Sequence, residues 1–316
     1  MPMTAQTDIR STELFKRLKA EVRGELAVER SLAALTTYRI GGPADLFFVP
    51  ADREDLAAAI RLCADMGEKY FVLGGGSNLL VRDGGLRGLV IHPAPALRRC
   101  WVVNKESEQG ELAAEAGVAT STLVATSARH GLGGLEFAVA IPGTVGGALA
   151  MNAGTPDGEM GDRIEGVELV TGEGRIARLS RDECGFAYRR TAFPAGAVIL
   201  EGHWRLPLRP SAEVQELAKR LTRERLERQP VGEACAGSMF KNPPGDYAGR
   251  LIEEAGCKGF KVGKAQVSNK HANFFINTGG ASAGDVEALV EEVGRRVRET
   301  NGVELELEIK VVGEPA

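Results

Sequence analysis

The segment Phe71-Val-Leu-Gly-Gly-Gly-Ser-Asn-Leu-Leu-Val81 decides the fold, because an apolar strand runs into three glycines, a serine and an asparagine before a second apolar strand begins. Glycine reaches positive φ and allows a ligand close to the main chain. Gly74, Gly75 and Gly76 can therefore point N–H groups at an anion, with the Ser77 hydroxyl as a further donor. The pattern suits a phosphate-binding loop, but this segment taken alone favours a plain glycine-rich turn.

The spacing excludes two common phosphate-binding motifs. A P-loop requires Gly-x4-Gly-Lys-Ser/Thr, and a dinucleotide fingerprint counted from Gly74 requires glycine where Leu79 stands. The fingerprint also requires a helix, whereas Leu79-Leu80-Val81 has the pattern of a strand.

A second segment, Ile141-Pro-Gly-Thr-Val-Gly-Gly-Ala-Leu-Ala-Met-Asn-Ala-Gly154, again combines glycines, small residues and one hydroxyl. Few of its side chains are large enough to block a ligand from the main chain. Two such segments in one domain favour a long ligand.

The composition is that of an ordinary globular protein, with 43% hydrophobic and 26% charged residues in 316. The length suits two or three domains. No apolar run approaches the roughly 20 residues that cross a bilayer, and the polar segment Met1–Asp8 lacks the apolar core of a signal peptide. We expect a cytoplasmic protein without membrane insertion.

Charge and cysteine content exclude further classes. The net charge of -4 argues against a nucleic-acid partner, while anionic small ligands can still bind at local sites. The five cysteines are odd in number and contain no Cys-x-x-Cys pair, so neither a disulfide framework nor a metal site is expected.

Hydrophobic periodicity predicts mixed α and β structure. An N-terminal helix is expected within 11–23, and a strand at 45–50, a helix at 53–66 and a strand at 69–73 form a βαβ unit with a parallel strand pair. Further strands are expected at 88–92, 100–104, 111–117, 164–170, 175–179 and 197–206, with a helix near 120–130. Beyond these we expect helices at 212–228, 246–255 and 285–300, and strands near 259–267, 273–277 and 303–312.

Pro207-Leu-Arg-Pro210 breaks this pattern, and Ser211 can cap the helix that follows, so a domain boundary is expected near residue 210. The first domain would cover 1–210, with a βαβ subdomain at about 30–95 and a second α+β subdomain at about 96–210. The second domain would cover 211–316.

Together the two glycine-rich segments resemble the paired loops of the FAD-binding fold shared by vanillyl-alcohol oxidase and p-cresol methylhydroxylase. Within that fold, Gly-Gly-Gly-Ser-Asn followed by Ile-Pro-Gly-Thr-Val-Gly-Gly and Asn-Ala-Gly looks most like the UDP-N-acetylenolpyruvoylglucosamine reductase family. The resemblance implies an α+β protein: a two-part FAD-binding domain followed by a smaller C-terminal α+β substrate domain.

The same resemblance implies which residues hold a noncovalent FAD. Arg39 belongs to a Thr-Thr-x-Arg-Ile-Gly-Gly-Pro segment that lies against the flavin in the family, although a surface turn explains it equally from the residues alone. The cofactor-binding residues implied are Arg39, Gly74, Gly75, Gly76, Ser77, Asn78, Leu79, Ile141, Pro142, Gly143, Thr144, Gly146, Gly147, Asn152 and Gly154.

The implied reaction reduces an enolpyruvyl ether with NADPH, so the chain must stabilise charge that develops on the substrate carboxylate and must supply a proton. Phe186-Ala-Tyr-Arg-Arg-Thr-Ala-Phe193 resembles the family segment that implies Arg189 as the stabilising cation. Ala236-Gly-Ser-Met-Phe-Lys-Asn-Pro243 implies Ser238 as the proton donor, and Leu305-Glu-Leu-Glu308-Ile309 implies that Glu308 acts beside Arg189.

Substrate contacts are implied by the same segments and by Lys264-Ala-Gln-Val-Ser-Asn-Lys-His-Ala-Asn-Phe274. They fall on Tyr188, Lys241, Asn242, Gln266 and His271, which would bind the UDP-sugar or NADPH. The chain resembles the subclass that lacks an inserted loop whose tyrosine covers the substrate diphosphate. We expect a monomer in peptidoglycan precursor synthesis.

Simpler explanations exist for each catalytic candidate when it is taken alone. Arg189 and Arg190 suit a solvated basic pair, and Ser238 suits a loop hydroxyl bonded to nearby backbone. Glu308 shares its predicted polar strand face with Glu304 and Glu306, and Leu307 stands where the family often has proline. Two other functions also remain open: a flavin oxidase of the same fold that uses oxygen, and a nucleotide-binding sensor without a redox cofactor.

Overall fold

The computed structural model describes residues 9–316, and the N-terminal segment Met1–Asp8 discussed above lies outside them. The chain forms two compact units, each built from separated stretches of sequence. Unit 1 comprises the residues up to Arg30 together with Ala44–Gly75 and Gly88–Leu221, and unit 2 comprises Ser31–Pro43, Gly76–Arg87 and Thr222–Ala316. These units therefore differ from the sequence-contiguous parts 1–210 and 211–316.

Unit 1 begins with a four-stranded sheet of strand order β1-β2-β5-β3. Its strands are β1 (Glu25–Ser31), β2 (Pro43–Val49), β3 (Tyr70–Val72) and β5 (Leu86–Ile91). The helices α1 (Glu13–Glu21) and α2 (Arg53–Met66) pack on each other, after the short 3-10 helix η1 (Ile9–Ser11). Asp52 caps α2 by accepting a hydrogen bond from the Asp55 N–H.

The elements expected around α2 are present, but the expected parallel pair is wrong. β5 lies between β2 and β3 and is the parallel neighbour of β3, so β2 and β3 do not pair. Leu89, Val90 and Ile91 are all fully buried, so both faces of β5 are apolar, which favours an inner place in the sheet. β1 was not expected, because the apolar pattern of its sequence is weak. In keeping with that pattern, none of its seven residues is buried.

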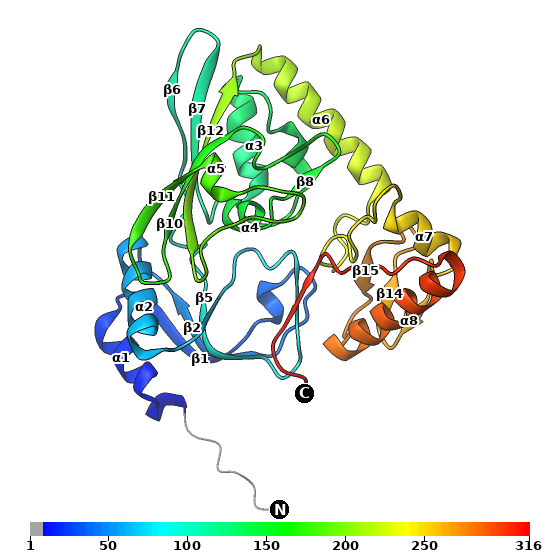
Figure 1. The fold of residues 1–316 in the computed structure, drawn as a ribbon, viewed down its shortest axis with the longest axis horizontal. Coiled ribbons are helices and arrows are strands. Elements are labelled where there is room, and N and C mark those ends of the chain that lie inside the picture. The colour runs from blue at the N-terminus through cyan, green and yellow to red at the C-terminus, as the bar shows by residue number, and fades with distance from the viewer. Residues whose placement is uncertain (1–8) are drawn as a thin grey trace, which may run out of the picture. The chain divides into compact units, whose positions relative to one another are not determined.

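A five-stranded antiparallel sheet of order β11-β10-β12-β7-β6 forms the rest of the unit 1 framework. Its strands are β6 (Cys100–Lys105), β7 (Gln109–Glu115), β10 (Ile164–Val170), β11 (Ile176–Ser180) and β12 (Val198–Pro207). Helices α3 (Thr120–Arg129) and α4 (Val145–Ala150) lie against it (Figure 1). These strands and α3 agree with the sequence-based predictions to within two residues at most ends.

Short elements complete unit 1 and bring the second glycine-rich segment onto this sheet. They are η3 (Glu136–Ala140), β8 (Gly154–Thr155), β9 (Gly158–Glu159) and α5 (Arg181–Cys184). The long helix α6 (Ser211–Arg228) begins one residue before the expected start at 212, so Ser211 is its first residue, and it continues past the end of unit 1.

Unit 2 is built around α8 (Ala283–Asn301), whose buried face includes Val286, Leu289 and Val293. Its strands are β4 (Leu79–Val81), β13 (Lys261–Val262), β14 (Ala265–Val267), β15 (Phe275–Asn277) and β16 (Lys310–Val312), and its other helices are η2 (Ala33–Leu35) and α7 (Ala248–Glu254). The expected extended region 259–267 is a hairpin that turns at Gly263, where φ is +52°. Parallel pairing of β4 with β16 joins the first glycine-rich segment to the C-terminal residues.

The alternating segment 303–312 is not the single long strand that its pattern predicts. Only Lys310–Val312 forms a strand, and Leu307 makes an isolated bridge with Phe240. The partner segment around Phe240 is soon followed by Pro243 and Pro244, which have no N–H to continue a ladder. The pattern therefore overestimated the length of the strand.

A partly buried ion cluster on β12 ties this strand to β7 and to the start of α2. His203 Nε2 lies 2.6 Å from Glu201 Oε1, and its Nδ1 lies 3.1 Å from Glu111 Oε1. Arg53 continues the cluster, with Nη2 3.5 Å from Glu201 Oε2 and Nη1 2.6 Å from Glu168 Oε1. The hydrogen bond to Glu201 raises the pKa of His203, so the imidazolium is favoured in the folded chain.

This cluster predicts a stability that depends on pH. Because folding raises the pKa of His203, the imidazolium contributes to the free energy of unfolding. This contribution is complete below the pKa of His203 in the unfolded chain, about 6.5, and is lost as pH rises through the pKa in the folded chain. Urea unfolding of the chain and of His203→Gln should give a larger difference in unfolding free energy at pH 6 than at pH 9. An equal or larger difference at pH 9 would contradict this assignment.

Candidate active site

The two glycine-rich segments meet main chain to main chain in unit 1. A Cβ added to Gly75 would lie 2.7 Å from Gly143 Cα and 3.3 Å from Thr144 N, and one added to Gly74 would lie 2.9 Å from Thr144 Oγ1. Contacts below 3 Å to backbone leave no room for a side chain. The sequence prediction that these segments act together is consistent with this packing.

The start of α4 is anchored by backbone hydrogen bonds to the edge of the five-stranded sheet. The Val145 N–H donates to Val118 O and the Gly146 N–H to Ala116 O, each at 2.8 Å. A Cβ on Gly147 would find only Thr144 Oγ1, at an ordinary 3.7 Å. A Cβ on Gly146 would lie 2.8 Å from Ala116 Cβ, so glycine is required there by packing within the protein, whereas Gly147 borders open space that a ligand can occupy.

These residues fit a cofactor held by main-chain atoms. Gly147 N lies 4.0 Å from the position of a Gly74 Cβ, so both glycine-rich segments border the same small-residue region. No large side chain comes from Gly74, Gly75 or Gly147, which suits the close approach of a dinucleotide such as FAD.

In unit 2 the first segment continues through Gly76, Ser77 and Asn78 into β4. A Cβ on Gly76, where φ is +59°, would lie 2.2 Å from Leu35 O. The Asn78 side-chain amide donates to Glu308 O at 3.2 Å, and Asn78 O accepts from the Lys310 N–H at 3.0 Å. The side chain of Asn78, expected to bind cofactor, therefore holds the segment that carries Glu308.

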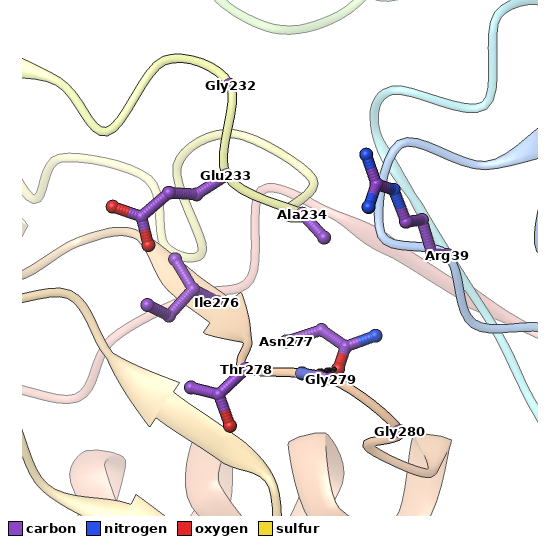
Figure 2. Close-up of a pocket in the computed structure, with 9 residues that line it drawn as sticks. All are labelled: Arg39, Gly232, Glu233, Ala234, Ile276, Asn277, Thr278, Gly279 and Gly280. Carbon is purple, nitrogen blue, oxygen red and sulfur yellow. Dashed lines mark hydrogen bonds between the residues drawn. The ribbon is translucent and has the colours of Figure 1, made fainter.

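Arg39 lines a pocket of about 540 Å³ in unit 2, together with Gly232–Ala234 and Ile276–Gly280 (Figure 2). Figure 2 shows Arg39 and Glu233 on opposite sides of this pocket. The Asn277 side chain joins the segment that carries Arg39 to the segment that carries Gly279. It donates to Tyr38 O at 3.0 Å and accepts from the Gly279 N–H at 2.9 Å. The guanidinium of Arg39 forms no ion pair with residues 9–316, so the pocket presents a cation.

Arg189 lies at the tip of a tight turn in unit 1. Ala187 and Arg190 exchange both backbone hydrogen bonds, at 2.9 and 3.0 Å, and Arg189 has a left-handed φ of +53°. Its Nη2 donates to Gly154 O at 2.9 Å, and its guanidinium stacks on the Tyr188 ring at 4.9 Å. The Arg189 side chain is only 14% exposed, so it is held in place and is not a loosely solvated cation.

Asn152 supports that turn. Its side chain is nearly fully buried, donates to Glu159 Oε2 at 2.6 Å and to Ala187 O at 3.1 Å, and accepts from the Gly161 N–H at 2.9 Å. The amide of Asn152, which was expected to bind cofactor, is thus used within the protein.

Three predicted site residues share an unusual backbone conformation. Among residues 9–316, the non-glycine residues with positive φ are Glu29, Arg39, Asn152 and Arg189. Such conformations cost on the order of 1–3 kcal/mol and cluster at functional sites. The overlap supports functional roles for this part of the candidate set.

The segments that carry Ser238 and Glu308 are joined in unit 2 by a short antiparallel contact between Phe240 and Leu307. The Glu308 N–H donates to Met239 O at 2.9 Å, and the Lys241 N–H donates to Glu306 O at 2.8 Å. Ser238 directly precedes Met239. Arg189 belongs to unit 1.

Sequence reasoning missed Asn273, which holds the Ser238 segment in shape. Its carbonyl oxygen accepts from the Phe240 N–H at 2.9 Å, and its amide donates to Phe240 O at 2.8 Å. Asn273 lies inside one of the segments matched to the family, but nothing in its spacing separated it from its neighbours. It is almost completely buried, so its role is to shape the chain.

The expected substrate contacts have mixed surroundings. Lys241 pairs with Glu306, and Asn242 Oδ1 accepts from the Ala248 N–H at the start of α7. Gln266 donates to Gly259 O at 3.2 Å, and Tyr188 is 51% exposed. His271 Nδ1 accepts from the Asn273 N–H at 3.3 Å, and burial lowers the pKa of its ring. Tyr188 thus lies at the surface, whereas Lys241, Asn242, Gln266 and His271 each already use one side-chain polar atom within unit 2.

Two family models match the chain: an FAD binding domain over residues 44–180, and the C-terminal domain of UDP-N-acetylenolpyruvoylglucosamine reductase over residues 229–312. The UDP-N-acetylenolpyruvoylglucosamine reductase of Geobacter metallireducens is 45% identical over 304 residues, which are 96% of this chain and 99% of the relative.

Solved structures agree with these matches. The crystal structure of UDP-N-acetylenolpyruvylglucosamine reductase (MurB) from Thermus caldophilus has a TM-score of 0.75 at 37% identity, over 92% of this chain and 99% of that one. Wild-type Phl p 4.0202, a glucose dehydrogenase, has a TM-score of 0.50 at 14% identity, over 63% of this chain and 45% of that one. The second likeness concerns the fold alone.

The space beside Gly147 gives a direct test of cofactor binding. Gly147→Ala should fold normally but bind FAD at least about tenfold more weakly, or about 1.4 kcal/mol, because the new methyl group occupies ligand space. Titration of the apoprotein, followed by quenching of flavin fluorescence, measures this affinity.

Gly294→Ala is the matched control, because Gly294 lies within α8 and a Cβ there meets nothing within 4 Å. It should raise stability by roughly 0.5–1 kcal/mol and leave FAD affinity unchanged. Unchanged affinity in Gly147→Ala would remove the second glycine-rich segment from the cofactor site.

Proposed function

This chain belongs to the UDP-N-acetylenolpyruvoylglucosamine reductase family, and we propose that Arg189, Ser238 and Glu308 perform its chemistry. The activity is the NADPH-dependent reduction of UDP-N-acetylglucosamine enolpyruvate to UDP-N-acetylmuramate. FAD, when bound, accepts hydride from NADPH and supplies it to the substrate. Family membership decides against the oxygen-dependent oxidase and the sensor without a redox cofactor.

The residues that would hold FAD come from both glycine-rich segments. Gly74 and Gly75 pack against Gly143 and Thr144, and Gly147 borders open space beside them. Main-chain N–H groups in such segments suit the pyrophosphate, because they provide donors without side chains that block approach. Arg39 adds a cation in the pocket of unit 2 and is proposed to contact an anionic part of the cofactor.

Arg189 is proposed to stabilise the negative charge that builds up on the substrate carboxylate as hydride adds to the adjacent double bond. A cation works best here when it is preorganised, because no reorganisation is then needed during the reaction. The strained turn, the bond to Gly154 O and the stacking on Tyr188 provide that order.

Ser238 is proposed to donate the proton that completes the reduction, with Glu308 acting beside Arg189 on the enol form. The observation that supports this pairing is the hydrogen bond from the Glu308 N–H to Met239 O, which places Glu308 beside the residue that follows Ser238. A hydroxyl is a weak acid, but it can protonate a carbanion that is a much stronger base when the geometry is correct.

We propose that residues 1–210 form the FAD-binding part and 211–316 the substrate-binding part, as the two family matches support. Tyr188, Lys241, Asn242, Gln266 and His271 are proposed substrate contacts. The substrate class supports a cytoplasmic enzyme of peptidoglycan synthesis, required for cell shape and division. A monomer is proposed, and light scattering of the purified protein measures its mass.

Residues 9–316 contain no helix that is both long and apolar enough to cross a membrane.

Ser238→Ala separates the two halves of the reaction. Reduction of bound FAD by NADPH should proceed at the parental rate, whereas reoxidation by UDP-N-acetylglucosamine enolpyruvate should slow by about 10²–10⁴-fold, because only the second half needs the serine proton. Anaerobic stopped-flow absorbance of the flavin band measures both. Equal slowing of the two half-reactions would contradict the role of Ser238 as proton donor.

A further inference from the structure

Glu159 is the carboxylate that faces Arg189 within unit 1. Its Oε1 lies 3.7 Å from Arg189 Nη1, and the Glu159 side chain is 28% exposed. Nothing in the sequence connects these two residues, which lie thirty positions apart, so only the fold reveals the pair.

The hairpin formed by β8 and β9 brings two acceptors to the same guanidinium. Gly154 and Glu159 are opposite each other in this hairpin. Gly154 O accepts from Arg189 Nη2 at 2.9 Å, while the Glu159 carboxylate faces Nη1. A Cβ on Gly154 would lie 2.7 Å from Glu159 Cγ, so the glycine is what allows the Glu159 side chain to cross the hairpin.

The other carboxylate oxygen of Glu159 is fixed by Asn152. The Asn152 amide donates to Glu159 Oε2 at 2.6 Å and to Ala187 O at 3.1 Å. Ala187 is the first residue of the turn that presents Arg189. One buried amide thus joins the carboxylate to the backbone of the arginine turn.

Arg189 needs such support, because its left-handed φ is unfavourable for a residue with a side chain. Without a fixed partner, the guanidinium could adopt several rotamers at the tip of a two-residue turn. A carboxylate held on its far side by Asn152 restricts these rotamers.

We propose that Glu159 is a positioning residue that orients the Arg189 guanidinium toward the substrate carboxylate. This inference rests on the charge-stabilising role proposed for Arg189. Glu159 itself touches neither substrate nor cofactor in this proposal. Glu159 fixes the position of the guanidinium. This matters because a small displacement of a charge-stabilising group lowers the reaction rate.

Glu159→Gln removes the charge that faces Arg189, while the side-chain carbonyl can still accept from Asn152. The variant should reduce its flavin with NADPH at the parental rate and reoxidise it with UDP-N-acetylglucosamine enolpyruvate about tenfold more slowly. Its melting temperature should remain close to that of the parent. Glu165→Gln is the matched control, because Glu165 also pairs with an arginine of unit 1, Arg205, and should change neither half-reaction.

The double variant Arg189→Ala/Glu159→Gln tests whether the two residues act together. Arg189→Ala should slow reoxidation strongly, and adding Glu159→Gln should cause no further slowing, because the positioned group is gone. If Glu159→Gln slows reoxidation equally with and without Arg189, or reoxidises at the parental rate, the positioning role is overturned. Slowing of both half-reactions together with a lower melting temperature would indicate a structural role and would also overturn it.

The same measurements distinguish a wrong role for Arg189 from a wrong role for Glu159. Parental reoxidation in Arg189→Ala would overturn the proposed role of Arg189, and with it the positioning role of Glu159. Slow reoxidation in Arg189→Ala with parental rates in Glu159→Gln would overturn only the role of Glu159.

Discussion

The close contact between Gly75 and Gly143 is the constraint on which the proposed cofactor site depends. With only 2.7 Å between a Gly75 Cβ and Gly143 Cα, any side chain at this position would force the two glycine-rich segments apart. Main-chain atoms from separate parts of the sequence can therefore border one ligand, while Gly147 leaves space beside them. The sheets and helices of unit 1 hold the two segments at this separation, and backbone bonds to Ala116 and Val118 anchor the second.

The residues proposed to act on the substrate are held differently, by side-chain hydrogen bonds to strained or short segments. Asn152 supports the Arg189 turn, Asn273 supports the segment after Ser238, and the Asn78 amide supports Glu308. Asparagine suits this work, because its amide both donates and accepts and can join two backbone segments at once. The unfavourable backbone conformation at a position such as Arg189 is thus offset by the buried hydrogen bonds around it.

Much of the fold could be predicted from periodicity, since β10, α2 and α8 lie where their apolar patterns place them. Periodicity does not reveal which strands pair, so the position of β5 between β2 and β3 was not predicted. The short length of β16 was not predicted either. The glycine-rich segments were recognisable because their chemistry is local. Glu159 and Asn273 were not, because each acts through a partner about thirty residues away and carries no local pattern.

An anaerobic visible spectrum of the purified protein, recorded as isolated, after NADPH and after UDP-N-acetylglucosamine enolpyruvate, tests the central claim most directly. The proposed mechanism, in which the chain holds FAD and supplies both the cation and the proton for the second step, predicts a flavin band that NADPH bleaches and that returns when the enolpyruvate is added. A band that stays bleached after addition of the enolpyruvate would contradict it.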